Sequence, residues 1–195
     1  MERILALIGF AIVSSVTPGP NNLLLWASGA EFGIRRTVPH ILGTAVGIGA
    51  MAVGVVVGIG ALLTLLPGLA FALKVAGSLY LLYLAWQVAG AGALRTGAVT
   101  RPMSLRQAAA FQVVNVKAWT FALGAITTFR PPELSSVAGG LVVALTMMVV
   151  IVPTAALWAI AGGLIGRWLA DERARRIVSL VLAAVLAVTV VFVWL

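Results

Sequence analysis

The hexapeptide TPGPNN at residues 17–22 constrains the fold most, because it interrupts an apolar stretch that otherwise suits one helix. Proline has no backbone N–H and clashes with the carbonyl four residues earlier. The two prolines therefore free the carbonyls of Ser14 and Val16, and the glycine between them permits a sharp bend. In hydrocarbon such a break persists only where it lines a cavity or meets other protein, so we expect a polar binding site here.

Composition indicates an integral membrane protein. Of the 195 residues, 62% are hydrophobic and 9% are charged, and the mean hydropathy is +1.14. A soluble domain has about 45–50% apolar and about 25% charged residues. The net charge of +8 does not predict nucleic-acid binding, since the basic residues lie in short loops and no aromatic platform accompanies them. With no cysteine and one histidine, we predict no metal site and no cofactor.

A membrane-spanning helix needs about 20 mainly apolar residues. Residues 4–13 are apolar like a signal peptide, but no A-x-A-like cleavage site follows, so we expect them to stay as part of the first span. On this criterion we predict one transmembrane domain, residues 1–195, with six spans at about 4–29, 40–66, 68–90, 108–129, 136–165 and 175–195.

Lysine and arginine gather on one side of these spans, and such a bias sets orientation in a membrane. Nine lie in the connectors after the first, third and fifth spans, and three lie on the other side. We therefore expect the basic connectors in the cytoplasm and both termini in the periplasm. The nine are Arg35, Arg36, Arg95, Arg101, Arg106, Arg167, Arg173, Arg175 and Arg176; the three are Arg3, Lys74 and Arg130.

The connector at 91–107 divides the spans into two halves, residues 1–90 and 108–195. A shift of about 99 residues lays the halves on each other, and residues 112–117 then fall opposite the first break. An odd number of spans per half gives the halves opposite orientations, as in many secondary transporters. We therefore predict an all-α membrane fold of six transmembrane helices in two inverted three-helix repeats, the first helix broken at Pro18-Gly19-Pro20.

The half-helix that starts at Pro20 presents the backbone amides of Asn21 and Asn22 near the middle of the membrane. Helix N-termini bind carboxylates and phosphates. The freed carbonyls of Ser14 and Val16 are acceptors for an ammonium, so the break suits a zwitterion such as an amino acid. A structural kink without a ligand is the alternative.

Lys117 lies deep in the fourth span, where a lysine costs about 2.5–3.5 kcal/mol and normally faces a cavity or a partner. No acidic residue lies inside a predicted span, so an anionic substrate group is its expected counter-ion. Snorkelling to the interface is the alternative. Asn115 could hydrogen-bond backbone freed at the first break, or form an ordinary interhelical hydrogen bond.

Four other polar residues are candidates for a pathway or for ion coupling. His40 could carry protons, with a polar interface residue as the plainer interpretation. Glu31 is the acid nearest the end of a span and a weaker candidate for a proton relay. Lys74 lies near the start of the third span, where snorkelling to the interface is the better explanation. Tyr80 could line a pathway or only pack.

Small residues recur at four-residue spacing in the second predicted span, at Gly43 and Gly47 and again at Gly54 and Gly58. Such spacing lets two helices approach closely. It could serve packing within the chain or the interface of a homodimer, and the spacing does not distinguish them.

Several motifs together resemble those of a known family. They are Pro-Gly-Pro-Asn at 18–21, Gly33, the Gly43 and Gly47 pair, the segment LKVAGSLYLLYLAW at 73–86, and Asn-Val-Lys at 115–117. The chain resembles the LysE/RhtB family of bacterial amino-acid exporters over nearly its whole length. This resemblance implies an inner-membrane exporter of amino acids or related metabolites, driven by the proton gradient.

One departure from the family pattern concerns the second break. Val116 stands where the family's Asn-Pro-Lys motif has proline, so we expect a less unwound helix and an altered pocket. The lack of acids inside the spans also favours neutral amino acids or small carboxylates over lysine or arginine as substrates.

We therefore predict a secondary transporter, not an enzyme, that exports small zwitterionic metabolites across the bacterial inner membrane by alternating access. The alternatives are an exporter of another small solute, such as an anion or metal ion, and a non-transporting scaffold. An intramembrane enzyme would need a nucleophile–base pair or a metal cluster, which the sequence lacks. The predicted substrate-binding residues are Ser14, Pro18, Gly19, Pro20, Asn21, Asn22, Asn115 and Lys117.

Overall fold

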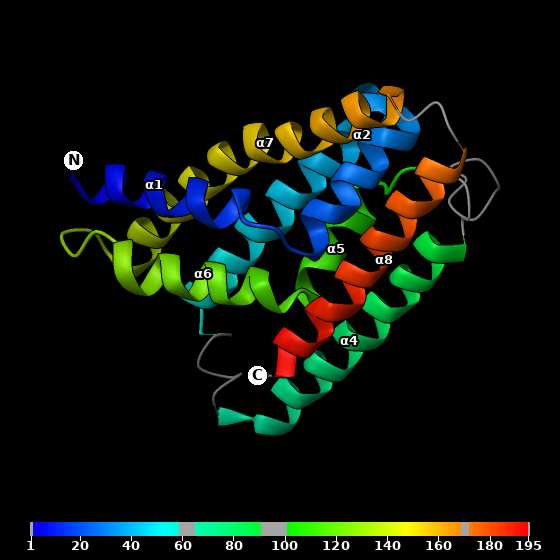
Figure 1. The fold of residues 1–195 in the computed structure, drawn as a ribbon. Helices are drawn as coiled ribbons and strands as arrows, with labels where there is room; N and C mark the ends of the chain where they lie inside the picture. The colour runs from blue at the N-terminus through cyan, green and yellow to red at the C-terminus, as the bar shows by residue number, and fades with distance from the viewer. Residues whose placement is uncertain (1, 59–64, 91–100, 169–171, 195) are drawn as a thin grey trace.

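The structure, a computed structural model, describes residues 2–58, 65–90, 101–168 and 172–194. In these residues the regular structure is entirely helical, without a strand, as predicted. Residues 91–100 of the predicted connector, with Arg95, lie outside the described residues. The helices, labelled as in Figure 1, are α1 (Glu2–Val16), α2 (Pro20–Val56), α4 (Pro67–Gly90), α5 (Leu105–Val114), α6 (Val116–Phe129), α7 (Ser136–Trp168) and α8 (Glu172–Trp194).

The first predicted break lies between α1, which ends at Val16, and α2, which begins at Pro20. A straight helix of the 37 residues of α2 would be far longer than the hydrocarbon core, which is about 30 Å thick. Gly33 interrupts α2 with φ 75° and ψ 166°, a conformation that is essentially restricted to glycine. Gly33 therefore divides α2 into residues 20–32, which overlap the first predicted span, and residues 34–56, which overlap the second.

The second break separates α5 from α6 at Asn115, whose φ of −88° and ψ of 99° are extended. The two helices are bent by 79°. This differs from the expectation that valine at position 116 leaves the helix less unwound. Asn115 lies in the backbone region that also suits a residue before proline, so the chain adopts the same kind of break without the proline.

Some of the six predicted spans correspond to helices long enough to cross a bilayer. Among the described residues, α2 and Ser136–Ile165 of α7 are long and apolar enough to span a bilayer, and α5 with α6 qualifies as one bent span. The apolar parts described in α4 and α8, Phe71–Trp86 and Arg176–Val191, are shorter.

Helices α2 and α7 pack against each other, and α7 runs along the upper edge of the molecule in Figure 1. Gly29 of α2 lies against the carbonyl of Ala159, and Gly162 of α7 lies against the carbonyl of Trp26, so a Cβ at either glycine would overlap backbone. Side chains from α1, α2, α6 and α7 form the main apolar core. Its fully enclosed members include Leu7, Ala11, Leu25, Ala52, Ala122, Ala125, Val143, Met147 and Ala159.

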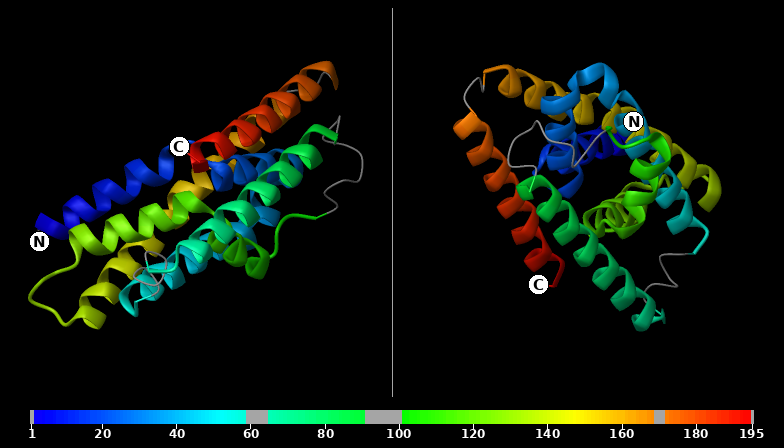
Figure 2. Two further views of the ribbon diagram at one scale, coloured as in Figure 1. Left: turned by 90° about the horizontal axis from the view of Figure 1, so that it is seen from below. Right: turned by 90° about the vertical axis from the view of Figure 1, so that its right-hand side faces the viewer.

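Helices α4 and α8 lie side by side along one flank (Figures 1 and 2). Near one end of this pair, Trp194 Nε1 donates a hydrogen bond to Ser78 Oγ at 2.9 Å. Gly77 of α4 lies against the Val114 carbonyl at the end of α5. This flank therefore contacts the rest of the molecule at the second break.

The Gly43 and Gly47 face of α2 packs within the chain. A Cβ at Gly43 would meet Leu105 and Ala108, and one at Gly47 would meet Ala109 and Gln112. These two glycines therefore allow α5 to approach α2 closely.

Candidate functional site

A pocket lies between the two helix breaks, and the space between its lining atoms, part of it open to the outside, is about 440 Å³. Six of the eight predicted substrate-binding residues line it; Pro18 and Pro20 bound the break without lining the pocket. The lining residues are Ser14, Ser15, Gly19, Asn21, Asn22, Thr44, Ile48, Gln112, Asn115, Lys117, Ala118, Phe121, Ile151, Thr154 and Ala155.

Side chains near the first break satisfy most of the carbonyls at the end of α1. Asn22 Nδ2 donates to the carbonyls of Ser15 at 2.6 Å and Thr17 at 2.9 Å. Thr17 Oγ1 donates to the carbonyls of Val13 and Ser14, both at 2.8 Å. The Ser14 carbonyl, expected to be free for a substrate ammonium, is therefore already paired. The amide nitrogen of Asn22 is likewise engaged in joining α1 to α2.

Lys117 connects the second break to the first. Its Nζ donates to the carbonyls of Thr17 at 2.7 Å and Pro18 at 3.3 Å, across 100 and 99 residues of sequence. A Cβ at Gly19 would lie 2.8 Å from Lys117 Cδ, so the glycine makes room for the lysine. The ammonium thus reaches backbone of the first break instead of extending to a membrane interface. Among the residues that line the pocket, no acidic side chain faces it.

A chain of buried amides crosses the pocket wall. Gln112 Nε2 donates to Asn21 Oδ1 at 3.0 Å, and Asn115 Nδ2 donates to Gln112 Oε1 at 3.2 Å. Thr44 Oγ1 lies 3.2 Å from Asn21 Oδ1 and 3.0 Å from the His40 carbonyl, so its proton is shared between two acceptors. Asn115 Oδ1 is buried and has no hydrogen-bond partner among the described residues. Most buried acceptors in proteins have a hydrogen-bond partner, so this atom is an exception.

Two helix N-termini reach the pocket. Gly19 is the N-cap residue of α2, and Asn115 is the N-cap residue of α6. No side-chain hydrogen bond caps either helix. The first amides of a helix have no intrahelical partners and carry about half a positive charge together. The Lys117 ammonium lies against the carbonyls of Thr17 and Pro18, so its charge adds to the amides at the start of α2 and makes the first break electropositive.

The family description "LysE type translocator" matches residues 12–194, which is most of the chain. The chain belongs to the LysE type translocator family. It is therefore a membrane transporter and not an enzyme. Proteins named cysteine/O-acetylserine efflux protein from Escherichia coli K12 and from Shigella flexneri serotype 5b are each 29% identical to it over 161 residues, 81% of this chain and 81% of the relative. No solved structure matches this chain.

The residues predicted for a pathway or for ion coupling lie outside the lining of this translocator's pocket. His40 is 1% exposed, and neither ring nitrogen has a partner among the described residues. Glu31 is exposed on α2. The Lys74 ammonium lies 5.8 Å above the Trp194 ring, a cation–π contact. Tyr80 packs in an apolar cluster.

Sequence reasoning missed Gln112, Thr44 and Thr154 as lining residues of the translocator pocket. Gln112 carried a signal, since a polar amide inside an apolar span needs a partner. Thr44 and Thr154 gave little indication of a site, because a threonine hydroxyl in a helix commonly donates a hydrogen bond to a carbonyl of its own helix. Both do so here.

Proposed function

We propose that this LysE type translocator exports neutral amino acids or related small zwitterions across the bacterial inner membrane by alternating access. The observation that carries the proposal is the mixed polarity of the pocket. Lys117 and the N-terminus of α2 suit a carboxylate, and Asn115 Oδ1 is a buried acceptor that suits an ammonium. The relatives named as cysteine/O-acetylserine efflux proteins support it, because both compounds are small zwitterions.

Charge balance favours a neutral amino acid over a basic one. The carbonyls of Thr17 and Pro18 hydrogen-bond the Lys117 ammonium without neutralising it. A substrate carboxylate supplies the missing negative charge. A basic substrate would bring an additional positive charge to a pocket whose lining contains no acid.

The proposal includes six spans in two inverted repeats. Two packed pairs support it: α2 with α7, and α4 with α8. After the shift of about 99 residues, residues 34–56 of α2 correspond to part of α7, and α4 corresponds to α8. Lys117 joins the two breaks across nearly the same separation. A site at the meeting of such repeats is the arrangement from which alternating access follows.

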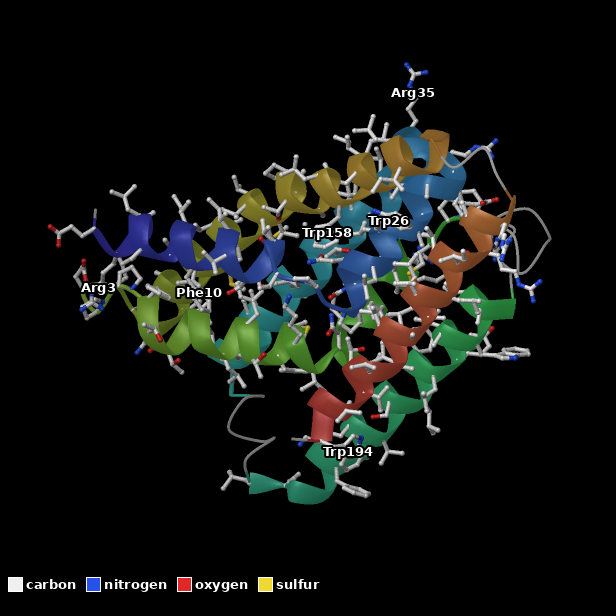
Figure 3. All side chains as sticks on the ribbon, in the orientation of Figure 1. Arg3, Phe10, Trp26, Arg35, Trp158 and Trp194 are labelled. Atoms are coloured by element: carbon white, nitrogen blue, oxygen red, sulfur yellow. The ribbon has the colours of Figure 1, made fainter. Side chains whose placement is uncertain are left out.

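The proposed orientation has both termini in the periplasm. Arg3 Nη1 contacts the Arg130 carbonyl at 3.5 Å, so these residues share one end of the molecule. Figure 3 labels Arg3 and Arg35 at opposite ends. A C-terminal reporter active only in the periplasm tests this orientation. A homodimer also stays a proposal, and it needs a surface other than Gly43 and Gly47.

Proton coupling is proposed to use His40. Its buried ring has no partner in the described chain, and its carbonyl shares the Thr44 hydroxyl with Asn21 of the pocket. We expect His40→Gln to keep facilitated exchange of substrate and to abolish efflux driven by an imposed pH gradient. Gradient-driven efflux at the wild-type rate would contradict this assignment.

Efflux from preloaded proteoliposomes tests the exporter function. We expect wild-type protein to release cysteine and O-acetylserine, and Asn21→Ala and Lys117→Ala to reduce release at least about tenfold, as expected for lost hydrogen bonds to a charged group. Arg106→Ala, an exposed arginine in the first turn of α5, is the control. Unchanged release in both pocket variants would remove the proposed site. Release of inorganic anions or metal ions alone would replace the proposed substrate class.

A further inference from the structure

Gln112 is the side chain that connects the two other amides of the pocket. It is 0% exposed. Its Nε2 donates to the carbonyl of Ala108 and to Asn21 Oδ1, both at 3.0 Å, and its Oε1 accepts from Asn115 Nδ2 at 3.2 Å. All three contacts are buried, so each must join a donor to an acceptor.

The backbone of α5 determines which way the Gln112 amide faces. The Ala108 carbonyl can only accept a hydrogen bond, so the atom of Gln112 beside it must be the nitrogen. Because the amide is planar, its oxygen then faces the other way, toward Asn115.

The orientation of the Gln112 amide determines the orientation of both asparagine amides. Asn21 must turn Oδ1 toward the Gln112 nitrogen, which leaves Asn21 Nδ2 as the atom able to serve the pocket. Asn115 must turn Nδ2 toward the Gln112 oxygen, which leaves Oδ1 unpaired in the described part of the chain. The pocket therefore has a fixed donor on α2 and a fixed acceptor at the second break.

We propose that Gln112 is a positioning residue that sets the polarity of the pocket, so that a zwitterion binds in a single orientation. This inference rests on the proposed function. The substrate carboxylate accepts from Asn21 Nδ2 on the electropositive side, and the substrate ammonium donates to Asn115 Oδ1. In the reverse orientation the substrate carboxylate faces the acceptor Asn115 Oδ1, and the substrate ammonium faces the donor Asn21 Nδ2. Neither pair can form a hydrogen bond, because two acceptors or two donors face each other.

The test compares three ligands on purified protein: cysteine, N-acetylcysteine, which lacks the ammonium, and cysteine methyl ester, which lacks the carboxylate. Binding is measured by calorimetry under reducing conditions. Gln112→Met keeps the approximate shape and makes none of the three hydrogen bonds. We expect its preference for cysteine over both derivatives to fall about tenfold, because both asparagines become free to turn.

Gln112→Glu tests the carboxylate end of the substrate separately from its ammonium end. It also serves as the second measurement if the Gln112→Met protein does not insert into the membrane. Binding is measured over a pH series, because burial favours the protonated carboxyl and only the ionised form lacks a donor for Asn21. The ionised carboxylate still accepts from Asn115, so Asn21 turns its oxygen toward the pocket. We expect the preference for cysteine over its methyl ester to fall about tenfold, and the preference over N-acetylcysteine to change less than about twofold.

Gln107→Met is the matched control. Gln107 is exposed on the same helix and completes the capping box with Ser104, so its loss affects the stability of α5 without reaching the pocket. Its ligand preferences are expected to equal those of wild type.

The outcomes distinguish the two proposals. If wild-type protein binds cysteine and loses binding in Asn21→Ala and Asn115→Ala, but both Gln112 variants keep wild-type preferences, the positioning role is wrong and the exporter function stands. If wild-type protein binds none of the three ligands, the proposed substrate class fails first.

Discussion

Between Val16 and Pro20 the chain is interrupted by prolines, whereas at Asn115 it is interrupted without one. At the first break a continuous helix is excluded by covalent structure, whatever surrounds it. At the second, every residue has a backbone N–H and could continue the helix. The second break therefore depends on partners for the backbone groups that it frees.

Those partners come from the second half of the chain itself. The Val113 carbonyl accepts from Trp119 Nε1 at 2.8 Å, and the Gln112 carbonyl accepts from the Asn115 amide at 3.1 Å. Lys117 ties the start of α6 to the carbonyl of Thr17. The comparison predicts that substitutions around the second break change the helix geometry, and that those around the first change stability alone.

The largest effect is expected for Lys117→Met, which removes the connection between the two breaks. Two carbonyls lose a charged donor, worth about 1.5–3 kcal/mol each, so both thermal stability and efflux should fall. A denaturation series in detergent and proteoliposome efflux measure the two effects. Arg106→Met, which removes an exposed cation from the neighbouring helix α5, is the control. A variant with wild-type stability would show that the connection between the breaks contributes nothing.

Trp119→Phe tests the second break by itself. The ring is kept, but the Val113 carbonyl loses its indole donor, and an unsatisfied group costs about 1–3 kcal/mol. We expect a lower melting temperature and a changed distance between spin labels placed on α5 and α6. Trp158→Phe, in the main core, controls for the loss of ring area. An unchanged label distance would mean that the bend does not depend on this hydrogen bond.

Asn22→Ala tests the first break and should do less. Two carbonyls lose the amide donor, but Thr17 keeps Lys117 and water in the pocket can replace part of the loss, so we expect about 1 kcal/mol. Labels on α1 and α2 should report the wild-type distance, because the prolines maintain the break. Straightening of these helices would contradict the proposed difference between the two breaks.

The smallest effect is expected for Val116→Pro, which introduces a proline at the second break. Position 116 is the first of α6, where proline costs no intrahelical hydrogen bond, and Asn115 before it is extended. We expect stability equal to wild type or higher by about 0.4–1 kcal/mol, with efflux within about twofold. Ala122→Pro, inside α6, should cost about 3 kcal/mol or more. A comparable loss at position 116 would show that the present break differs from a proline break.

Much of the site could be predicted because its members are costly in a membrane. The two prolines and Lys117 each require an unusual environment, so they indicated a polar site before any fold was known. The separation of about 99 residues correctly placed Lys117 opposite the first break. Gln112 was not predicted as a site residue, although it lay within the segment that this separation singled out.

Other features could not be predicted from residue types. Nothing local distinguishes Thr44 from a threonine that bonds its own helix, because its second contact, with Asn21, lies 23 residues away. The glycine at 33 was noticed as part of a motif, but its positive φ depends on how α2 turns back toward α7.

By itself the sequence determined the membrane environment, the helical class and the first break, since hydrophobicity and the missing N–H of proline act wherever the chain lies. The tertiary structure alone decided the second break, the pairing of Lys117 with the first break, and the direction in which each amide of the pocket faces. Those features depend on hydrogen bonds between residues about 100 positions apart in the sequence. A hydrogen bond needs both a donor and an acceptor, so the type of one residue does not determine it.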